Sequence, residues 1–282
     1  MAALEVLSTR ACFGGSVAFC RHESLETGTP MRFGVFVPPQ AEAGPVPAVY
    51  YLAGLECTEE TFLIKANAVR VAAEFGLMLV APDTSPRGAG IAGEDDDWTF
   101  GTGAGFYVDA TAQPWAAHYR MYSYVTRELP ALISANFPEN GARRGIFGHS
   151  MGGHGALVIG LREPRAWRSV SAFAPIANPV AVPWGENAFS RYLGPDRAAW
   201  AEYDASLLMQ KFPHASDILV DQGDADPFLE TQLHPDALEA AAAKSGQRLT
   251  LRRQPGYDHS YWIIQSFIAD HLAWHGARLH AP

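Results

Sequence analysis

Residues 146–155 read Ile-Phe-Gly-His-Ser-Met-Gly-Gly-His-Gly, and the architecture can be worked out from this stretch. The two apolar residues at its start predict the end of a buried strand, and the following run into Ala156–Val158 predicts a helix. Gly148 and Gly152 flank Ser150, as expected where a tight, strained turn leaves no room for a Cβ atom. The pattern is typical of a nucleophile elbow, in which strain directs a serine hydroxyl outward. Because a bare G-x-S-x-G also arises by chance, its strand and helix flanks carry much of the prediction.

Compact apolar segments recur along the rest of the chain. They show little polar alternation, which is typical of strands buried on both faces. The segments between them place apolar residues at three- and four-residue spacing, which predicts helices. The expected strands are Ala48–Leu52, Leu77–Ala81, Ile146–Gly148, Val170–Phe173, Ile218–Val220 and Arg248–Arg253. The expected helices are Tyr119–Phe137, which Pro130 should kink or divide, Leu229–Lys244 and Tyr261–Trp274.

The N-terminal part follows a different pattern. Ser16–Arg21 and Met31–Val37 contain aromatic and β-branched residues, and the turn-prone run Glu26–Pro30 separates them, which predicts a hairpin. Together these patterns predict an α/β-hydrolase fold, with a mostly parallel central sheet, an antiparallel N-terminal part and helices on both faces. No Pro/Gly-rich tract is long enough to mark a linker, so we expect a single domain over residues 1–282.

Two regions do not fit simple strand–helix alternation. Residues 83–115 are rich in glycine, aspartate and aromatic side chains, and residues 178–194 are interrupted by prolines and glycines. Long loops in a compact domain tend to be functional. Each region follows a strand at the edge where α/β sheets bind ligands, so we expect both to form walls of the pocket.

A serine hydroxyl is a weak nucleophile unless a base takes its proton. His259 lies in a turn-like segment before the last helix, where a loop histidine can reach the sheet edge that carries Ser150. His271, His275 and His280 lie on or beyond that helix, from which the serine is harder to reach. His259 is therefore the candidate base, and the alternative interpretation is a surface or capping histidine.

Three carboxylates follow the expected strand Ile218–Val220, namely Asp221, Asp224 and Asp226. Any of them could orient and stabilise the base, and spacing alone does not choose among them. Asp226 lies farthest past the strand and is held extended by Pro227, which favours it by position. The alternative is that one or more of these aspartates caps the helix that follows.

Two backbone N–H groups are expected to form an oxyanion hole, which stabilises the negative charge of an acyl-transfer intermediate. One belongs to the residue after the nucleophile, which is Met151. The other should come from the loop after the buried run Ala48–Leu52, where Leu55 follows the flexible Gly54. A side chain does not reveal a backbone role, so Leu55 is assigned from the fold rule alone.

Composition excludes several other classes of function. The formal charge of −9 is spread along the chain, and no run of Lys and Arg offers a footprint for nucleic acid. The acidic run Glu94–Asp97 lacks the spaced ligands of a metal site and is typical of a solvated turn. We therefore expect no nucleic-acid partner, no metal and no cofactor.

Cys12, Cys20 and Cys57 are odd in number and lack C-x-x-C spacing, which predicts reduced thiols and no disulfide framework. The first residues contain no apolar core of signal-peptide length, and no segment approaches 18 uninterrupted apolar residues. These features favour a cytoplasmic protein that does not enter membranes. Cys57 itself could be misread as a nucleophile, but it has no histidine partner of its own. A thiol beside the pocket or an inert buried cysteine fits better.

Several long and unusual strings resemble the S-formylglutathione hydrolase (esterase D) family, and the resemblance covers nearly the whole chain. It includes the elbow segment Gly148–Gly155, the loop that contains Leu55, and the segment around His259. The strings are Cys12–Gly15, Gly54–Glu59, Asp83–Gly88, Trp98–Tyr107, Tyr119–Tyr124, Gly148–Gly155, Pro183–Gly185, Asp221–Gly223, Asp226 with Phe228-Leu229, and Asp258–Tyr261.

The resemblance implies a triad of Ser150, Asp226 and His259, with Leu55 and Met151 as oxyanion donors, and so selects among the three aspartates. It also implies hydrolysis of S-formylglutathione to glutathione and formate, a step of formaldehyde detoxification that proceeds through a formyl-enzyme. The partner would then be a small glutathione thioester.

The resemblance also bears on the substrate pocket and on rival functions. It implies that Cys57 lies beside the active site and that Trp184 forms a pocket wall, for which ordinary loop packing is the alternative. His149, next to the serine, is a further pocket candidate. A homodimer is possible. The rival functions are a general carboxylesterase for small acyl esters and, from another class, a non-catalytic binding protein on a hydrolase fold.

Overall fold

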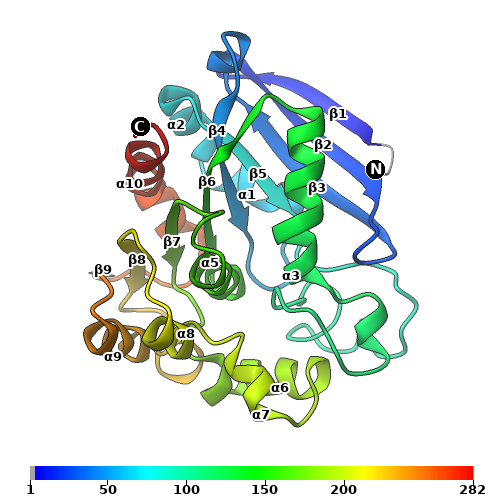
Figure 1. Cartoon of the computed structure of the whole chain (residues 1–282), viewed down its shortest axis with the longest axis vertical. Coiled ribbons are helices and arrows are strands. Elements are labelled where there is room, and N and C mark those ends of the chain that lie inside the picture. The colour runs from blue at the N-terminus through cyan, green and yellow to red at the C-terminus, as the bar shows by residue number, and fades with distance from the viewer. Residues whose placement is uncertain (1–3, 282) are drawn as a thin grey trace.

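A nine-stranded sheet runs through the computed structural model, which describes residues 4–281 (Figure 1). The strand order is β1-β2-β3-β5-β4-β6-β7-β8-β9. Neighbouring strands from β1 to β5 in this order are antiparallel, and those from β5 to β9 are parallel. This arrangement confirms the predicted α/β-hydrolase fold. The strands are β1 (Glu5–Cys12), β2 (Gly15–Glu23), β3 (Pro30–Val37), β4 (Val46–Leu52), β5 (Met78–Pro82), β6 (Glu139–His149), β7 (Ser169–Phe173), β8 (Ile218–Gly223) and β9 (Leu249–Gln254).

Both faces of the sheet are apolar, and each is covered by helices. In β4, Tyr50 faces one hydrophobic core and its neighbours Val49 and Tyr51 face the other, as the two-residue period of a strand requires. Helices α4 (Leu129–Asn136), α5 (Met151–Arg162), α8 (Ala205–Lys211) and α9 (Pro235–Ser245) cover the Tyr50 face. Helices α1 (Glu59–Lys65), α2 (Ala68–Phe75) and α10 (Tyr261–Leu279) cover the opposite face. Strands buried on both sides explain the continuous apolar runs of the sequence.

The outermost strand, β1, was not predicted from the sequence. Within the part of the chain that the structure describes, it pairs with β2 alone, and most of its side chains are exposed. A strand without a buried face carries no alternating hydrophobic pattern, so nothing in Glu5–Cys12 distinguished it from a loop.

Two expected helices differ from their predicted form, in both cases beside a proline. The segment Tyr119–Phe137 consists of α3 (Met121–Ser123), a π-helical turn over Tyr124–Glu128, and α4, in which Pro130 is the second residue. Helical residues therefore run without a break from Met121 to Asn136, and the expectation that Pro130 kinks or divides the segment is met only by a change of helix type: the π-helical turn lies directly before Pro130, which cannot donate to the carbonyl of the preceding turn.

The expected helix Leu229–Lys244 is wrong as a single element. A π-helical turn over Leu229–Leu233 ends at His234, whose φ of +48° breaks the helix, and α9 begins at Pro235. Proline disfavours the α conformation in the residue before it, which explains the break. The last helix is longer than expected, because α10 continues to Leu279.

The two regions predicted as irregular differ from each other. Residues 83–114 form a loop without helices, whereas residues 178–194 contain the ten-residue helix α6 (Pro183–Tyr192). Pro183 starts this helix, and Gly185 is needed because a Cβ atom there would lie 2.0 Å from the carbonyl oxygen of Pro179. Gly185 is therefore required for the close packing of α6 against Pro179, and it does not indicate a loop. The remaining elements are 3-10 turns at Pro39–Glu42, Trp115–Ala117 and Pro179–Ala181, and helix α7 (Arg197–Ala201).

Candidate active site

Ser150 lies at the sharp turn between β6 and α5. Its backbone has φ +58° and ψ −121°, a strained combination for a residue with a side chain. A Cβ atom on Gly148 would lie 2.3 Å from the Gly152 carbonyl oxygen, and one on Gly152 would lie 1.9 Å from that of Leu52. The two glycines are therefore required for the turn, as the sequence predicted.

The structure places Ser150, His259 and Asp226 in one hydrogen-bonded chain. Ser150 Oγ lies 2.8 Å from His259 Nε2, and His259 Nδ1 lies 2.5 Å from Asp226 Oδ2. The serine and the carboxylate are buried, whereas the imidazole retains 15% exposure. A serine hydroxyl that donates to an imidazole, which in turn donates to a carboxylate, is the arrangement that makes serine nucleophilic.

Asp226 is held in place by the loop that follows β8. The Phe228 N–H donates to its Oδ1 atom at 2.9 Å, and the Gln222 side-chain amide donates to its Oδ2 atom at 3.3 Å. These bonds and that from His259 satisfy the buried carboxylate, and no Lys or Arg side chain within residues 4–281 forms an ion pair with it. A carboxylate free of an arginine or lysine partner keeps its full charge available to an imidazolium.

The other two aspartates of this segment lie elsewhere. Asp221 lies within β8 and pairs with Arg252 and His271 on the α10 side of the sheet. Asp224 is exposed, and its carboxylate accepts from the Gly256 N–H. Neither of them bonds to His259, so the structure brings only Asp226 of the three within reach of that ring.

The loop after β4 brings a backbone donor towards the serine. A Cβ atom on Gly54 would lie 3.2 Å from Ser150 Cβ, so glycine allows this close approach. The next N–H, that of Leu55, has no protein acceptor among residues 4–281. Met151 is the first residue of α5, and the first N–H groups of a helix have no partner within it. Both expected donors are thus available to an oxyanion.

His149 packs directly against the candidate base. The centroids of the His149 and His259 rings lie 4.5 Å apart, and the His149 side chain is buried with no hydrogen-bond partner at Nε2 among the described residues. Burial and the nearby His259 ring lower the pKa of His149 well below its usual value. It therefore contacts the base as a neutral ring.

Cys57 lies in the same loop as Leu55, and its thiol is partly buried next to Tyr261. Burial raises the pKa of this thiol, which outweighs the hydrogen bonds to Tyr261 and Thr61 that lower it. The Tyr261 ring is in turn 6.2 Å from the His149 ring. Cys57 is thus near the candidate site through its neighbours but is a weakly ionised thiol.

Aromatic side chains line the acid side of the site. Phe228 packs edge-on against the His259 ring at 5.1 Å, and Trp184 packs on Phe228 at 4.7 Å. Trp184 in turn meets Trp98 of the 83–115 region at 5.5 Å. Both irregular regions therefore contribute to one aromatic wall. Sequence reasoning missed the role of Phe228, although its place two residues after Asp226 was a usable signal.

The sequence predicted neither a metal site nor a membrane-spanning segment, and residues 4–281 can be searched for both. Within this range no group of three or more His, Cys, Asp and Glu side chains could hold a metal ion. In the acidic run, Glu94 accepts hydrogen bonds from the N–H groups of Ala89 and Gly90, and Asp97 accepts from Thr99. No helix in the described part of the chain is both long and apolar enough to cross a bilayer.

The fold and the elbow serine with its histidine and aspartate define the class of protein, a serine esterase of the α/β-hydrolase fold. The chain matches the esterase family, described as "Putative esterase", over residues 24–277. It is 55% identical over 281 residues to the S-formylglutathione hydrolase of Mus musculus, covering 99% of this chain and 100% of that protein. The corresponding protein of Paracoccus denitrificans (strain Pd 1222) is 51% identical over 277 residues, which are 98% of this chain and 99% of that one.

A solved structure extends this similarity to three dimensions. An S-formylglutathione hydrolase from Agrobacterium tumefaciens superimposes with a TM-score of 0.94 at 49% identity, over 97% of this chain and 99% of that chain. The chain belongs to the esterase family and, within it, to the S-formylglutathione hydrolases, which confirms the resemblance seen in the sequence. The Staphylococcus aureus serine hydrolase FphF, at 18% identity and a TM-score of 0.74, shares the fold alone.

Proposed function

We propose that this enzyme hydrolyses S-formylglutathione to glutathione and formate, with Ser150 as nucleophile. The Ser150 hydroxyl proton passes to His259 Nε2 as Oγ bonds to the formyl carbon, and the carbonyl electron pair moves onto oxygen. Asp226 stabilises the imidazolium that forms. The N–H groups of Leu55 and Met151 donate to the oxyanion.

Collapse of this intermediate breaks the carbon–sulfur bond and leaves a formyl ester on Ser150. The leaving group is a thiolate, which takes the proton from His259 to give glutathione. Because a thiolate leaves easily, general-acid help matters less here than for an alkyl ester, while the oxyanion donors matter for both. A water molecule then gives a proton to His259 as its oxygen bonds to the formyl carbon. Collapse of this second intermediate breaks the bond between that carbon and Ser150 Oγ, which takes the proton back from His259, and formic acid leaves and ionises to formate.

The Ser150–His259–Asp226 hydrogen-bonded chain carries the proposal for the chemistry. The substrate rests on the similarity of the whole chain to S-formylglutathione hydrolases of 51–55% identity. The aromatic wall of Trp184 and Phe228 supports a closely bounded acyl site. We assign the irregular regions 83–115 and 178–194 to pocket walls of a single domain over residues 1–282, with Cys57 and His149 at the pocket margin.

We also propose a cytoplasmic location. Cys12, Cys20 and Cys57 are all free thiols, as a reducing compartment requires. The homodimer and the absence of nucleic-acid partners stay predictions.

An assay of glutathione release from S-formylglutathione tests the proposal, with p-nitrophenyl acetate as a parallel substrate. We expect kcat/KM for the thioester to exceed that for the ester by at least about 100-fold, and Ser150→Ala to abolish both activities. Equal values of kcat/KM would favour a general carboxylesterase. Full activity in Ser150→Ala would contradict the assignment of Ser150 as nucleophile. Absence of both activities in the wild type would favour the alternative function, a non-catalytic binding protein on a hydrolase fold.

A further inference from the structure

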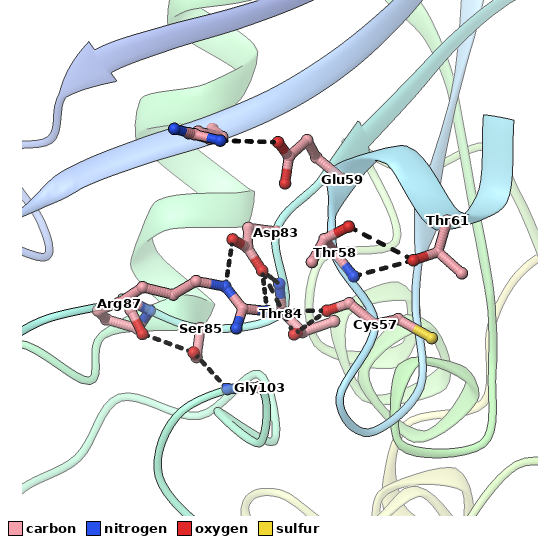
Figure 2. A network of polar contacts seen from close by, with 11 residues as sticks. Cys57, Thr58, Glu59, Thr61, Asp83, Thr84, Ser85, Arg87 and Gly103 are labelled. Carbon is pink, nitrogen blue, oxygen red and sulfur yellow. Dashed lines mark hydrogen bonds and ion pairs between the residues drawn. The ribbon is translucent and has the colours of Figure 1, made fainter. Parts of the chain in front are cut away.

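The loops that follow β4 and β5 contact each other through a network of polar bonds (Figure 2), and Gly54 in the first of them approaches Ser150 closely. The first loop contains Leu55 and Cys57, and the second begins at Asp83. β4 and β5 are parallel neighbours, so both loops leave the same edge of the sheet. This adjacency allows side chains of the second loop to hold the backbone of the first.

Two side chains of the second loop donate to one backbone atom of the first. The Thr84 hydroxyl donates to the Cys57 carbonyl oxygen at 2.6 Å, and Arg87 Nη2 donates to the same oxygen at 3.1 Å. Figure 2 shows both bonds, with the Cys57 thiol directed away from Arg87. Thr84 is fully buried, so its hydroxyl has no water to replace the carbonyl as a partner.

Asp83 orients both donors. Its Oδ1 accepts from the Thr84 N–H at 2.7 Å and from Arg87 Nη2 at 2.9 Å, and its Oδ2 accepts from Arg87 Nε at 2.8 Å. The carboxylate is buried, and the paired bonds keep the planar guanidinium in one orientation. The donors to Cys57 are therefore fixed before any substrate binds.

A second contact holds the residue between Leu55 and Cys57. The Glu56 N–H donates to the Gly103 carbonyl oxygen at 2.9 Å, and the Gly103 N–H donates to Ser85 Oγ at 2.8 Å. Glu56 has φ +64°, which is uncommon for a residue with a side chain and persists only where its surroundings hold it. The strained backbone thus depends on the same 83–103 segment.

From these contacts we propose that Thr84 and Arg87 are positioning residues of the oxyanion hole. By holding the Cys57 carbonyl they set the direction of the Leu55 N–H, two residues earlier, towards the oxygen of the substrate. The proposal rests on the proposed function, in which Leu55 donates to the oxyanion. It extends that function to two residues that need not touch the substrate.

The expected effect follows from the geometry of oxyanion donors. Such a donor must lie within about 2.7–3.1 Å of the developing oxyanion, and its loss costs about 10²–10³-fold in kcat. A loop that keeps its fold but relaxes by a fraction of an ångström should lose part of that contribution. The substrate itself binds through other contacts, so kcat should fall while KM stays nearly constant.

Thr84→Val tests the proposal, because valine keeps the shape of threonine and removes only the hydroxyl. We expect kcat to fall about tenfold or more for both S-formylglutathione and p-nitrophenyl acetate, with KM within about twofold. Affinity for phenylboronic acid, whose adduct with Ser150 is tetrahedral, should fall by a similar factor. Thr84→Ser, which restores the hydroxyl, should recover kcat to within about threefold of the wild type.

A matched control removes a buried threonine hydroxyl elsewhere. Thr27 is fully buried in the turn between β2 and β3 and donates within that turn, so Thr27→Val should leave kcat unchanged. Arg87→Lys gives a second test, because lysine keeps the charge but cannot bond Asp83 and Cys57 with a planar fork. It should show the same fall in kcat at constant KM, so the proposal stays testable if Thr84→Val does not fold.

Three results would overturn the proposal. They are an unchanged kcat in Thr84→Val, a change confined to KM, and a Thr84→Ser variant as impaired as Thr84→Val, which would indicate packing. Failure of the proposed function is separate, because it would appear in the wild type as ester turnover without thioester turnover. The ester assay would then still test the role of Thr84.

Discussion

Residues 4–281 contain two hydrogen-bonded Ser–His–Asp arrangements, which differ in that the histidine of one is partly exposed and that of the other is fully buried. In the first, Ser150 bonds His259, which bonds Asp226. In the second, Ser171 Oγ lies 2.8 Å from His271 Nδ1, and His271 Nε2 lies 3.0 Å from Asp221 Oδ2. Both follow the chain order serine, aspartate, histidine.

The second arrangement is a structural network between the sheet and α10, because Ser171 lies in β7, Asp221 in β8 and His271 in α10. Ser171 lies in the middle of β7, and it, His271 and Asp221 have no exposed surface. Ser171 also bonds His275, and Asp221 is paired with Arg252. A hydroxyl between two buried rings and a carboxylate already neutralised by an arginine can stabilise the fold but cannot attack a substrate.

The comparison shows that hydrogen-bond geometry alone does not distinguish a reactive Ser–His–Asp set from a structural one. Ser150 differs from Ser171 in its strained backbone at the end of β6, which places its hydroxyl at the edge of the sheet beside a histidine whose side chain is 15% exposed. Among residues 4–281, Asp221 is paired with Arg252, whereas Asp226 accepts from the Gln222 amide, the Phe228 N–H and His259 and forms no ion pair with Lys or Arg. Access and an uncompensated carboxylate, more than residue types or their order, separate the reactive set from the structural one.

The largest expected effect separates the two serines. Ser150→Ala should lower kcat/KM by about 10⁴-fold or more, because the nucleophile is lost, and should leave Tm almost unchanged. Ser171→Ala should leave kcat/KM within about threefold but cost on the order of 1–3 kcal/mol of unfolding free energy, since two buried imidazoles lose a partner. Steady-state kinetics and thermal unfolding of both variants measure this. A large loss of activity in folded Ser171→Ala would contradict the comparison.

The two aspartates should differ in a similar way. Asp226→Asn should lower kcat by about 10³–10⁴-fold, because a neutral amide neither stabilises the imidazolium nor maintains its tautomer. Asp221→Asn should preserve kcat but destabilise the fold by about 3 kcal/mol, because Arg252 and His271 lose a buried carboxylate. Urea unfolding measures the stability of each variant. Loss of activity in Asp221→Asn at a temperature where it is fully folded would be evidence against a purely structural role.

The stability that the buried network of Ser171, His271 and Asp221 contributes should depend on pH. Burial of Asp221 opposes its ionisation, but hydrogen bonds from His271 and Arg252 outweigh this and lower its pKa from 3.8 to about 2. A depressed carboxyl pKa contributes stability that is present above about pH 4 and is lost as the pH falls towards 2. The contribution is on the order of 2 kcal/mol. Unfolding free energies measured between pH 5 and pH 2 should therefore converge for the wild type and Asp221→Asn, and parallel curves would contradict this origin.

The acyl chain of the substrate should reveal how closely the reactive site is bounded. With Trp184 and Phe228 beside His259, kcat/KM should fall by about tenfold or more at each step from formyl to acetyl to butyryl thioesters of glutathione. The alkaline hydrolysis rates of the same thioesters correct for their intrinsic reactivity. A flat corrected profile would rule out a tight acyl pocket.

The smallest expected effect concerns two cysteines, Cys20 and Cys57, which differ in solvent exposure as the two Ser–His–Asp arrangements do. Burial raises the pKa of both thiols, but Cys20 is fully buried with a pKa of about 11, whereas Cys57 is partly exposed. Iodoacetamide at pH 8–9 should therefore modify Cys57 in the folded protein, spare Cys20 and lower activity several-fold by obstructing the pocket. Peptide mapping and activity follow this together. Equal sensitivity in Cys57→Ser would assign the effect to another residue.

Local sequence was sufficient for the elbow and for most of the sheet. The glycines around Ser150 and the apolar runs of β4 to β8 act over a few neighbouring residues, so their signals are continuous in the chain. The exposed β1 and the helix α6 had no such signal, because β1 buries no face and Gly185 of α6 serves a contact with Pro179.

Local sequence could not predict which serine, histidine and aspartate side chains come together. Asp221 and Asp226 are five residues apart, and the first lies within β8 facing α10 whereas the second lies past the strand facing His259. Residues 33 to 109 positions apart must be brought together by the packing of strands and helices for the Ser150–His259–Asp226 chain to form. The chemistry of the elbow could thus be recognised in ten residues, but its partners and its exposure depend on contacts that exist only when the whole sheet has assembled.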